Sequence, residues 1–244
     1  MLKRAAQILL DTVYPPQCLL CRDLVLDEGG LCGKCWRDTP FIFQTICDLC
    51  GAPLPGEARD WAAYCDDCLH SGGRAWVQGR AAMLYSGNAP RLVMALKHGD
   101  RMALAWHFGH WMRRAAGRML GPECLLVPVP LHWSRMVKRR YNQSALLAQA
   151  IGKQANLPVA LDALLRSRAT PALDGAGRRA RAETLSGAIC PHPRHGAKLM
   201  GREVVLIDDV MTSGATLTQA ALAARAAGAK RVCVLVLARV AKEP

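Results

Sequence analysis

The 244-residue chain lacks any apolar run that approaches the roughly 20 residues needed to cross a bilayer. Residues 1–13 contain a short apolar stretch behind Lys3 and Arg4, but Asp11 interrupts it. No small-residue cleavage site follows, so this segment does not have the form of a secretory signal peptide. We therefore predict a cytoplasmic protein without a membrane span, in which residues 1–14 form a short amphipathic helix packed on the body.

Acidic residues are in the minority. The chain has 19 aspartates and glutamates against 32 lysines and arginines, which gives a formal net charge of +13. A positive surplus of this size favours polyanionic ligands such as phosphorylated sugars, nucleotides or nucleic acid. The alternative interpretation is a soluble surface in an arginine-rich composition, and charge alone does not separate the two.

Large apolar residues are scarce between residues 15 and 70, so this block cannot fold by burial alone. Four Cys-x-x-Cys pairs lie in it, and two such pairs can complete a closed tetrahedral zinc site of the structural kind. Four pairs together favour zinc over redox chemistry, and the missing signal peptide disfavours disulfides. The eight predicted zinc ligands are Cys18, Cys21, Cys32, Cys35, Cys47, Cys50, Cys65 and Cys68.

The spacing of these pairs favours two zinc sites built sequentially. Ten residues separate the first two pairs and fourteen separate the last two, and both gaps suit a ribbon hairpin. The first four cysteines would then bind one zinc ion and the last four the other. A crossed arrangement, first pair with third and second with fourth, stays open. We predict a double zinc ribbon over residues 15–70 and one globular domain over residues 71–244.

The 71–244 domain alternates predicted strands with predicted helices. Apolar runs at 124–130, 204–207 and 232–240 are typical of buried strands, and helical spacings follow at 142–155 and 217–227. This alternation predicts an α/β fold with a parallel sheet and right-handed crossovers. Ligands of such sheets bind at the carboxyl ends of the strands.

A candidate ligand site directly follows the strand at 204–207. Asp208 and Asp209 come first, and a loop of small residues then leads into a helix. Loop N–H groups and a helix N-terminus suit a phosphate, while paired carboxylates suit the hydroxyls of a sugar. The loop has no lysine, which excludes a P-loop. The predicted phosphate-binding residues are Thr212, Ser213, Gly214, Ala215 and Thr216.

Basic segments are placed to bind further phosphates. Lys97 ends a helical stretch, and Arg139 lies in a basic loop between a strand and a helix. The arginine- and glycine-rich segment 166–186 has the composition of a flap that closes over a polyphosphate. The alternatives are a solvated basic loop and a disordered surface loop.

The order of these motifs resembles the ComF family, also called ComFC or GntX-like proteins, over nearly the whole chain. This resemblance implies a type I phosphoribosyltransferase-like parallel sheet with flanking helices, preceded by a small zinc-ribbon domain. The motifs that carry it are the four Cys-x-x-Cys pairs, Leu92 with Lys97 and Gly99, Val127–Pro130, Arg139–Gln143, Arg166 with Arg168 and Thr170, and Asp208–Thr216.

The last of these motifs resembles the site for phosphoribosyl pyrophosphate (PRPP) in type I phosphoribosyltransferases. There the acidic pair holds the ribose, directly or with Mg²⁺, and the loop holds the 5-phosphate. The resemblance implies a PRPP-binding protein linked to competence, DNA uptake and nucleic-acid handling, with single-stranded DNA and a helicase-like uptake ATPase as partners. One alternative is an active phosphoribosyltransferase with Asp208 and Asp209 as its catalytic pair. Another is a zinc-ribbon adaptor with a vestigial pocket.

Three positions depart from the family pattern. Arg140 stands where the family has glycine, Leu173 where it often has glutamine, and Thr184 where it usually has asparagine. Two of these positions lie in the flap, whereas the Asp208–Thr216 motif is intact. The pattern therefore favours PRPP binding over transfer chemistry.

Overall fold

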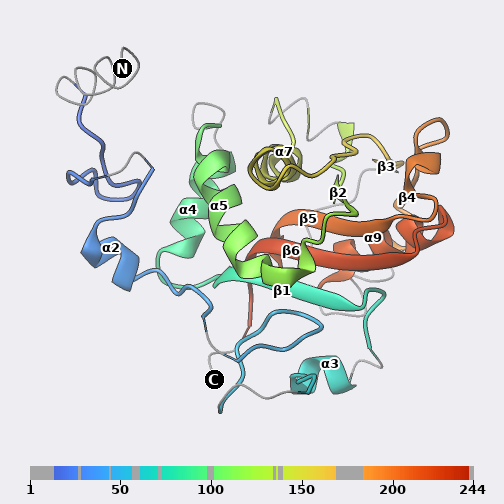
Figure 1. Ribbon diagram of the computed structural model, residues 1–244, viewed down its shortest axis with the longest axis horizontal. Helices are drawn as coiled ribbons and strands as arrows, with labels where there is room; N and C mark the ends of the chain where they lie inside the picture. The colour runs from blue at the N-terminus through green and yellow to red at the C-terminus, as the bar shows by residue number, and fades with distance from the viewer. Residues whose placement is uncertain are drawn as a thin grey trace.

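The computed structural model describes residues 14–26, 29–43, 45–56, 61–70, 73–97, 102–133, 136, 140–168 and 184–241. Its centre is a parallel sheet with the strand order β1-β6-β5-β2 (Figure 1). The predicted α/β class, with a parallel sheet behind a cysteine-rich block, is confirmed. The strands are β1 (Gln78–Leu84), β2 (Cys124–Pro128), β5 (Glu203–Met211) and β6 (Arg231–Arg239).

Branched apolar runs explain why β5 and β6 occupy the centre of the sheet. Their residues 204–207 and 232–237 are buried, as expected of parallel strands that are covered on both faces. β1 and β2 lie at the two edges of the sheet. β5 is longer than predicted, because Asp208, Val210 and Met211 still pair with β6.

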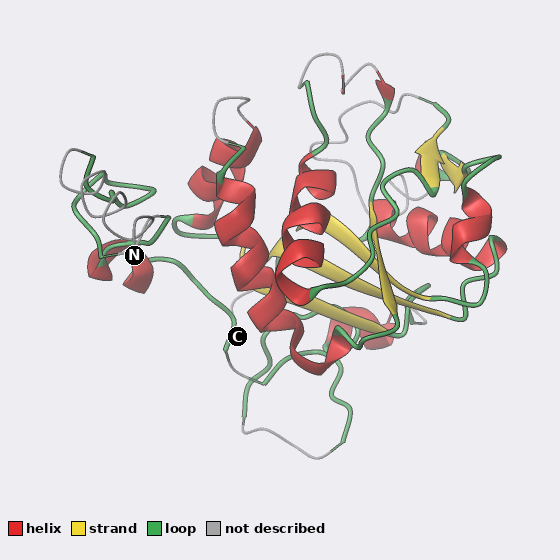
Figure 2. Ribbon diagram, turned by 45° about the horizontal axis from the view of Figure 1, so that its top comes forward, coloured by secondary structure: helices red, strands yellow, loops and turns green. Residues whose placement is uncertain are grey.

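Helices cover both faces of the sheet (Figure 2). One face carries α4 (Ala89–Lys97), α5 (Leu104–Ala116) and α7 (Gln143–Ala155). α9 (Ala215–Ala226) packs on the other face, next to the small antiparallel pair β3 (Leu164–Arg166) and β4 (Ile189–Pro191). Short 3-10 turns, η1 (Gly117–Met119) and η2 (Gly196–Leu199), lead into β2 and β5.

Local chemistry sets where two of these helices begin. Asn142 caps α7, since its side-chain oxygen accepts a hydrogen bond from the Ser144 N–H at 3.0 Å. α9 begins at Ala215, two residues before the predicted start, because Gly214 takes a left-handed conformation with φ +82°. Both helices therefore start at the end of the sheet where β5 finishes.

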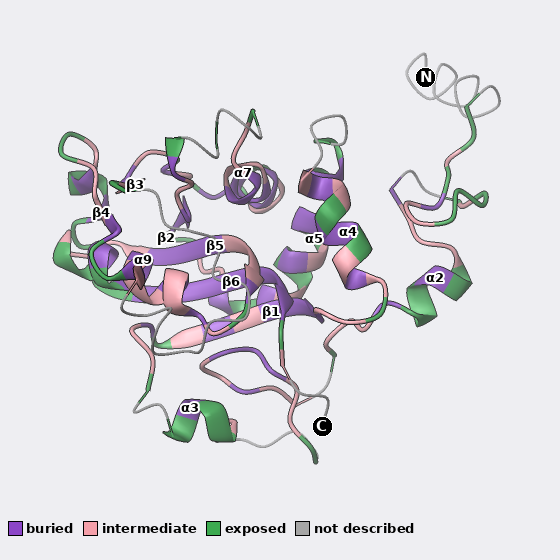
Figure 3. Cartoon of the chain, turned by 180° about the vertical axis from the view of Figure 1, so that it is seen from behind, coloured by how far each residue is buried: buried purple, intermediate pink, exposed green. Residues whose placement is uncertain are grey.

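The cysteine-rich block has two parts that meet the domain at different places (Figures 1 and 3). The first contains α2 (Gly33–Arg37) and packs Leu19, Leu20 and Leu31 against the core under α4 and α5. The second contains α3 (Asp66–His70) and contributes Cys47, Cys50 and Cys68 to the core cluster on the α9 face. The second part is thus an integral layer of the domain.

Several predictions concern residues that the structure does not describe. Residues 1–13 of the N-terminal helix predicted at 1–14, most of the flap (residues 169–183) and Arg139 lie outside the described residues. The domain limits at 15–70 and 71–244 stay a prediction. Within the described ranges, no helix is both long enough and apolar enough to cross a bilayer.

Candidate functional site

Three elements converge on the acidic pair of β5. Ser144, in the first turn of α7, donates its hydroxyl hydrogen bond to Asp208 Oδ1 at 2.9 Å. The backbone N–H of Asp209 donates to the same oxygen at 2.9 Å. Lys97, the last residue of α4, places its Nζ 3.4 Å from Asp209 Oδ2. Lys97, predicted from the sequence as a phosphate ligand, therefore lies beside the carboxylates.

Burial and the neighbouring charge of Asp209 raise the pKa of Asp208 to about 7. The hydroxyl of Ser144, the N–H of Asp209 and the charge of Lys97 act in the opposite direction but do not compensate. Near neutral pH the pair therefore holds on average less than its full negative charge. A bound cation, or hydroxyl groups that donate hydrogen bonds, would favour the fully ionised pair.

This raised pKa predicts that Asp208→Asn stabilises the protein at alkaline pH. Between pH 4 and 7 the folded state keeps a proton on Asp208 that the unfolded state releases, so wild-type stability falls as pH rises and then levels off. Asparagine does not titrate, so the variant does not lose this stability as the pH rises. Between about pH 5.5 and about pH 8, the free energy of unfolding of the variant, measured in urea, should therefore rise by about 2 kcal/mol relative to that of wild type.

Asp162→Asn is the matched control for that measurement. Asp162 is a well-exposed carboxyl whose pKa is lowered by its hydrogen bond from Lys198. Asp162 also contacts His195, but both partners favour its ionised form, so the control should show no gain of this size at alkaline pH. Equal stability differences for Asp208→Asn at both pH values would contradict the assignment of a raised pKa.

The loop after β5 has the geometry of an anion cradle. The first N–H groups of α9 have no acceptor within the helix, and the helix dipole favours negative charge there. Ser213 Oγ lies 3.4 Å from the Ala215 N–H and shapes the turn. A Cβ on Gly214 would come within 3.1 Å of the Trp76 ring, a tight contact, and the positive φ independently favours glycine at this position.

Four residues that hold this site were not singled out as site residues from the sequence. Tyr141 donates its hydroxyl hydrogen bond to the Leu96 carbonyl at 2.6 Å and so fixes the end of α4 next to Lys97. Ser144 holds Asp208, while Arg74 and Arg239 hold the loop. The cap signal of Asn142 could have located Ser144. No local pattern marks the two arginines.

The eight cysteine sulfurs gather in two groups in the sequential arrangement. Within each group all Sγ atoms lie within 4.8 Å of one another, and the pairs Cys21–Cys32 and Cys50–Cys65 are 3.5 Å apart. Four thiolates around a zinc ion at 2.3 Å would stand about 3.8 Å apart. Both groups therefore fit Zn²⁺. The groups are Cys18, Cys21, Cys32 and Cys35, and Cys47, Cys50, Cys65 and Cys68.

Crowding of the sulfurs in the second group also indicates a cation. Burial and the negative charge of Cys50 raise the pKa of Cys65 to about 11. Hydrogen bonds from Cys47 and Cys68, together with the positive charge of Arg239, lower the pKa of Cys50. Without a metal, the four thiols cannot all ionise at neutral pH. Zn²⁺ would supply the charge that four thiolates need.

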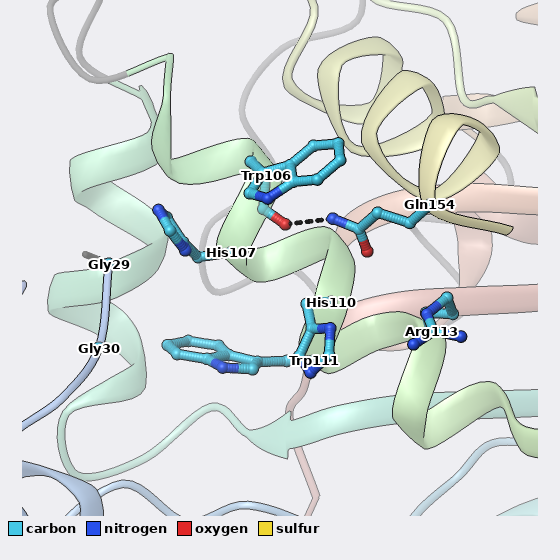
Figure 4. A pocket seen from close by; sticks show the side chains of 8 residues that line it. All are labelled: Gly29, Gly30, Trp106, His107, His110, Trp111, Arg113 and Gln154. Carbon is cyan, nitrogen blue, oxygen red and sulfur yellow. Dashed lines mark hydrogen bonds between the residues drawn. The ribbon is translucent and has the colours of Figure 1, made fainter. Parts of the chain in front are cut away.

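A separate pocket of about 420 Å³ lies between the first ribbon, α5 and α7 (Figure 4). Trp106, whose side chain is half exposed, forms one wall, and Lys153 Nζ lies 5.7 Å from the centre of its ring. The described residues of the lining include no carboxylate; they are Gly29, Gly30, Trp106, His107, His110, Trp111, Arg113 and Gln154. Rings and cations together suit a stacked base with its phosphate.

Comparison with known proteins identifies relatives along almost the full chain. A family model for a double zinc ribbon domain matches residues 9–69. DNA utilization protein YhgH of Escherichia coli K12 is 30% identical over 233 residues, which cover 92% of this chain and 97% of that protein. Competence protein F of Haemophilus influenzae is 26% identical, with 91% and 96% covered.

Among solved structures, phosphoribosylpyrophosphate synthetase of Mycobacterium smegmatis matches 58% of this chain and 34% of its own, at 15% identity and a TM-score of 0.31. The relatives matched by sequence are the more informative, because the alignments run through both the cysteine-rich block and the sheet domain. By identity and coverage together, this chain belongs to the ComF family of competence and DNA utilization proteins.

Proposed function

We propose that this ComF-family protein binds PRPP at the end of β5 and acts in nucleic-acid handling. The observation that carries the proposal is the placement of two carboxylates, a lysine and a glycine-containing helix start at one strand end. Carboxylates suit ribose hydroxyls, and the loop at 212–216 suits the 5-phosphate. Lys97 lies beside Asp209, so a ligand whose ribose contacts the carboxylates would place one of its phosphates near the Lys97 ammonium group.

The acidic pair also fits Mg²⁺, the usual companion of a diphosphate. Mg²⁺ takes oxygen ligands and is commonly held by one or two carboxylates plus substrate phosphates. Asp208 and Asp209 supply such oxygens, and a bound cation would favour the ionised form of Asp208, whose pKa is raised by burial and by the charge of Asp209. Bound there, Mg²⁺ would neutralise phosphate charge. The chain's own contribution is to orient the ribose and its 5-phosphate.

Calorimetry with PRPP and Mg²⁺ on the zinc-loaded protein tests this proposal. We expect saturable binding with one PRPP per chain, and weaker binding of ribose 5-phosphate or pyrophosphate alone, because each offers only part of the contacts. No heat with PRPP, under conditions where the protein is folded and contains zinc, would refute the proposal.

Transfer chemistry is the alternative use of the same site. An enzyme would release pyrophosphate when PRPP meets the correct acceptor base, and electrostatic stabilisation by Lys97 and Mg²⁺ would assist the departure. A panel of nucleobases assayed for pyrophosphate release separates the two. The family departures at Leu173 and Thr184 favour binding without release.

The Trp106 pocket favours single-stranded nucleic acid as a second ligand. Stacking on an exposed tryptophan contributes about 1–3 kcal/mol per base. We expect Trp106→Ala to weaken binding of a short single-stranded DNA about 5-fold to 100-fold, and binding of every variant to weaken with added salt. Trp61→Ala is the control, since Trp61 is an exposed tryptophan in the other ribbon. Salt-independent affinity would contradict the model.

A further inference from the structure

Two arginines hold the carbonyl side of the loop that leads from β5 to α9. Arg74 donates from Nη1 to the Ser213 carbonyl at 2.8 Å. Arg239 donates from Nη1 to the carbonyl groups of Thr212, at 2.5 Å, and Met211, at 3.3 Å. Three consecutive loop carbonyls are therefore bound by guanidinium groups.

Pinned carbonyls determine where the loop N–H groups point. In a trans peptide the C=O of one residue and the N–H of the next point in opposite directions. Holding the carbonyls of residues 211–213 toward the arginines therefore turns the N–H groups of residues 212–214 away from them. An anion site made of backbone N–H groups needs this orientation before the ligand arrives.

Arg74 also reaches the second cysteine group. Its Nε lies 3.4 Å from Cys68 Sγ, so one guanidinium bridges a zinc-ligand sulfur and the loop. Trp76 adds a second connection: its indole N–H donates to the Leu49 carbonyl, inside the Cys47–Cys50 knuckle, at 2.5 Å. The ring of Trp76 also sits against Gly214. The loop and the ribbon thus share their supports.

Charge balance explains why the two arginines lie close to the second cysteine group. Arg239 is 3% exposed, and within the described ranges neither arginine forms an ion pair with a carboxylate. A buried cation without a counter-charge is strongly unfavourable. Zinc held by four thiolates carries a net charge of about −2, which would balance the two guanidinium groups.

We infer that the second Cys₄ site is the support of the phosphate loop, with Arg74 and Arg239 as positioning residues between them. Zinc in this site then sets the affinity for the ligand phosphate although no zinc ligand touches it. The inference rests on the proposed PRPP site for its ligand, while the physical connection between ribbon and loop can be measured separately.

Arg74→Gln on the zinc-loaded protein tests the inference, with Arg80→Gln as the matched control. Arg80 also binds the second ribbon, through Asp48 at 2.9 Å, but its hydrogen bonds to described residues go to Asp48 and Gly79 rather than to the loop. We expect Arg74→Gln to keep two zinc ions and lose about 10-fold to 100-fold in PRPP affinity, because a charge-assisted hydrogen bond is removed. Arg80→Gln should keep wild-type affinity. Equal PRPP affinities for the two variants would overturn the inference.

Hydrogen exchange separates this inference from the proposed function. Peptides that cover residues 211–217 should exchange faster in Arg74→Gln than in Arg80→Gln or wild type, with no ligand present. If wild type fails to bind PRPP but this difference is seen, the proposed ligand is wrong and the support role stands. If exchange is unchanged, the support role is wrong whatever the ligand.

Discussion

Cys50→Ser is expected to abolish cooperative folding of the sheet domain, whereas Cys21→Ser is expected to leave its main unfolding transition in place. Cys50 is fully buried within the core cluster that contains Trp76 and Val234. Cys21 is exposed, and its ribbon meets the domain through a few apolar side chains and the Arg91–Leu20 contact. The two predicted zinc sites should therefore differ in their effect on global stability.

Magnitudes support this difference. Binding of a structural zinc ion is worth roughly 10–16 kcal/mol, while a whole domain is stable by only about 5–15 kcal/mol. Loss of the second zinc removes a term as large as the total, and it leaves the buried thiols of Cys47 and Cys68 within the core. Loss of the first zinc releases a ribbon that contributes little to the main core.

Thermal unfolding followed by tryptophan fluorescence, together with zinc analysis, makes the comparison. Wild type should contain two zinc ions and each variant fewer. The main transition should persist in Cys21→Ser and vanish in Cys50→Ser. Two variants with the same residual transition would show that the second ribbon is as peripheral as the first.

Asp208→Asn combined with Asp209→Asn should lower the affinity for PRPP with Mg²⁺ at least about 100-fold. Each carboxylate that accepts a hydrogen bond from ribose is worth about 1.5–3 kcal/mol, and the pair is also the predicted place for Mg²⁺. The double variant also frees Lys97 from its ion pair with Asp209, which would strengthen the binding of a phosphate. This gain is a single cationic contact and is smaller than the loss of two carboxylates. Calorimetry at pH 8, where the wild-type pair is mostly ionised, gives the largest difference.

The control for this experiment is Asp38→Asn combined with Glu123→Gln. Both carboxylates are exposed and belong to neither cysteine group, and their replacement changes the net charge by the same amount. If both double variants lost affinity equally, the effect would be a matter of overall charge. The acidic pair of β5 would then have no specific role.

Short-range sequence patterns correctly predicted those elements whose ends depend on neighbouring residues. The end of α7 at Ala155 and the residues of its cap follow from helical spacing and from Asn142. The predicted end of β5 at residue 207 was wrong. Adjacent aspartates are typical of a strand end, but pairing with β6 continues the strand to Met211. That pairing is a long-range property which residues near Asp208 do not encode.

The supports of the loop lie beyond local patterns for the same reason. Arg74 and the Ser213 carbonyl are 139 positions apart, and Arg239 and the Thr212 carbonyl are 27 positions apart. In the sequence Arg74 follows the small residues Ser71, Gly72 and Gly73, and Arg239 ends an apolar strand, so neither position suggests a ligand site. Only the packing of the second ribbon against β6 brings them together.

The position of β6 has a consequence for how the protein is made. β6 lies between β1 and β5 although it follows both in the chain. Gln78 of β1 therefore cannot pair with its partner Cys233 until β6 has been synthesised. At ribosomal speeds of about 5–20 residues per second, this interval is on the order of 10 s. All eight ribbon cysteines have emerged long before it ends. The nascent chain can therefore bind zinc before β6 completes the sheet. In a zinc-poor cell, β6 would be synthesised before the second ribbon, against which it packs, has folded.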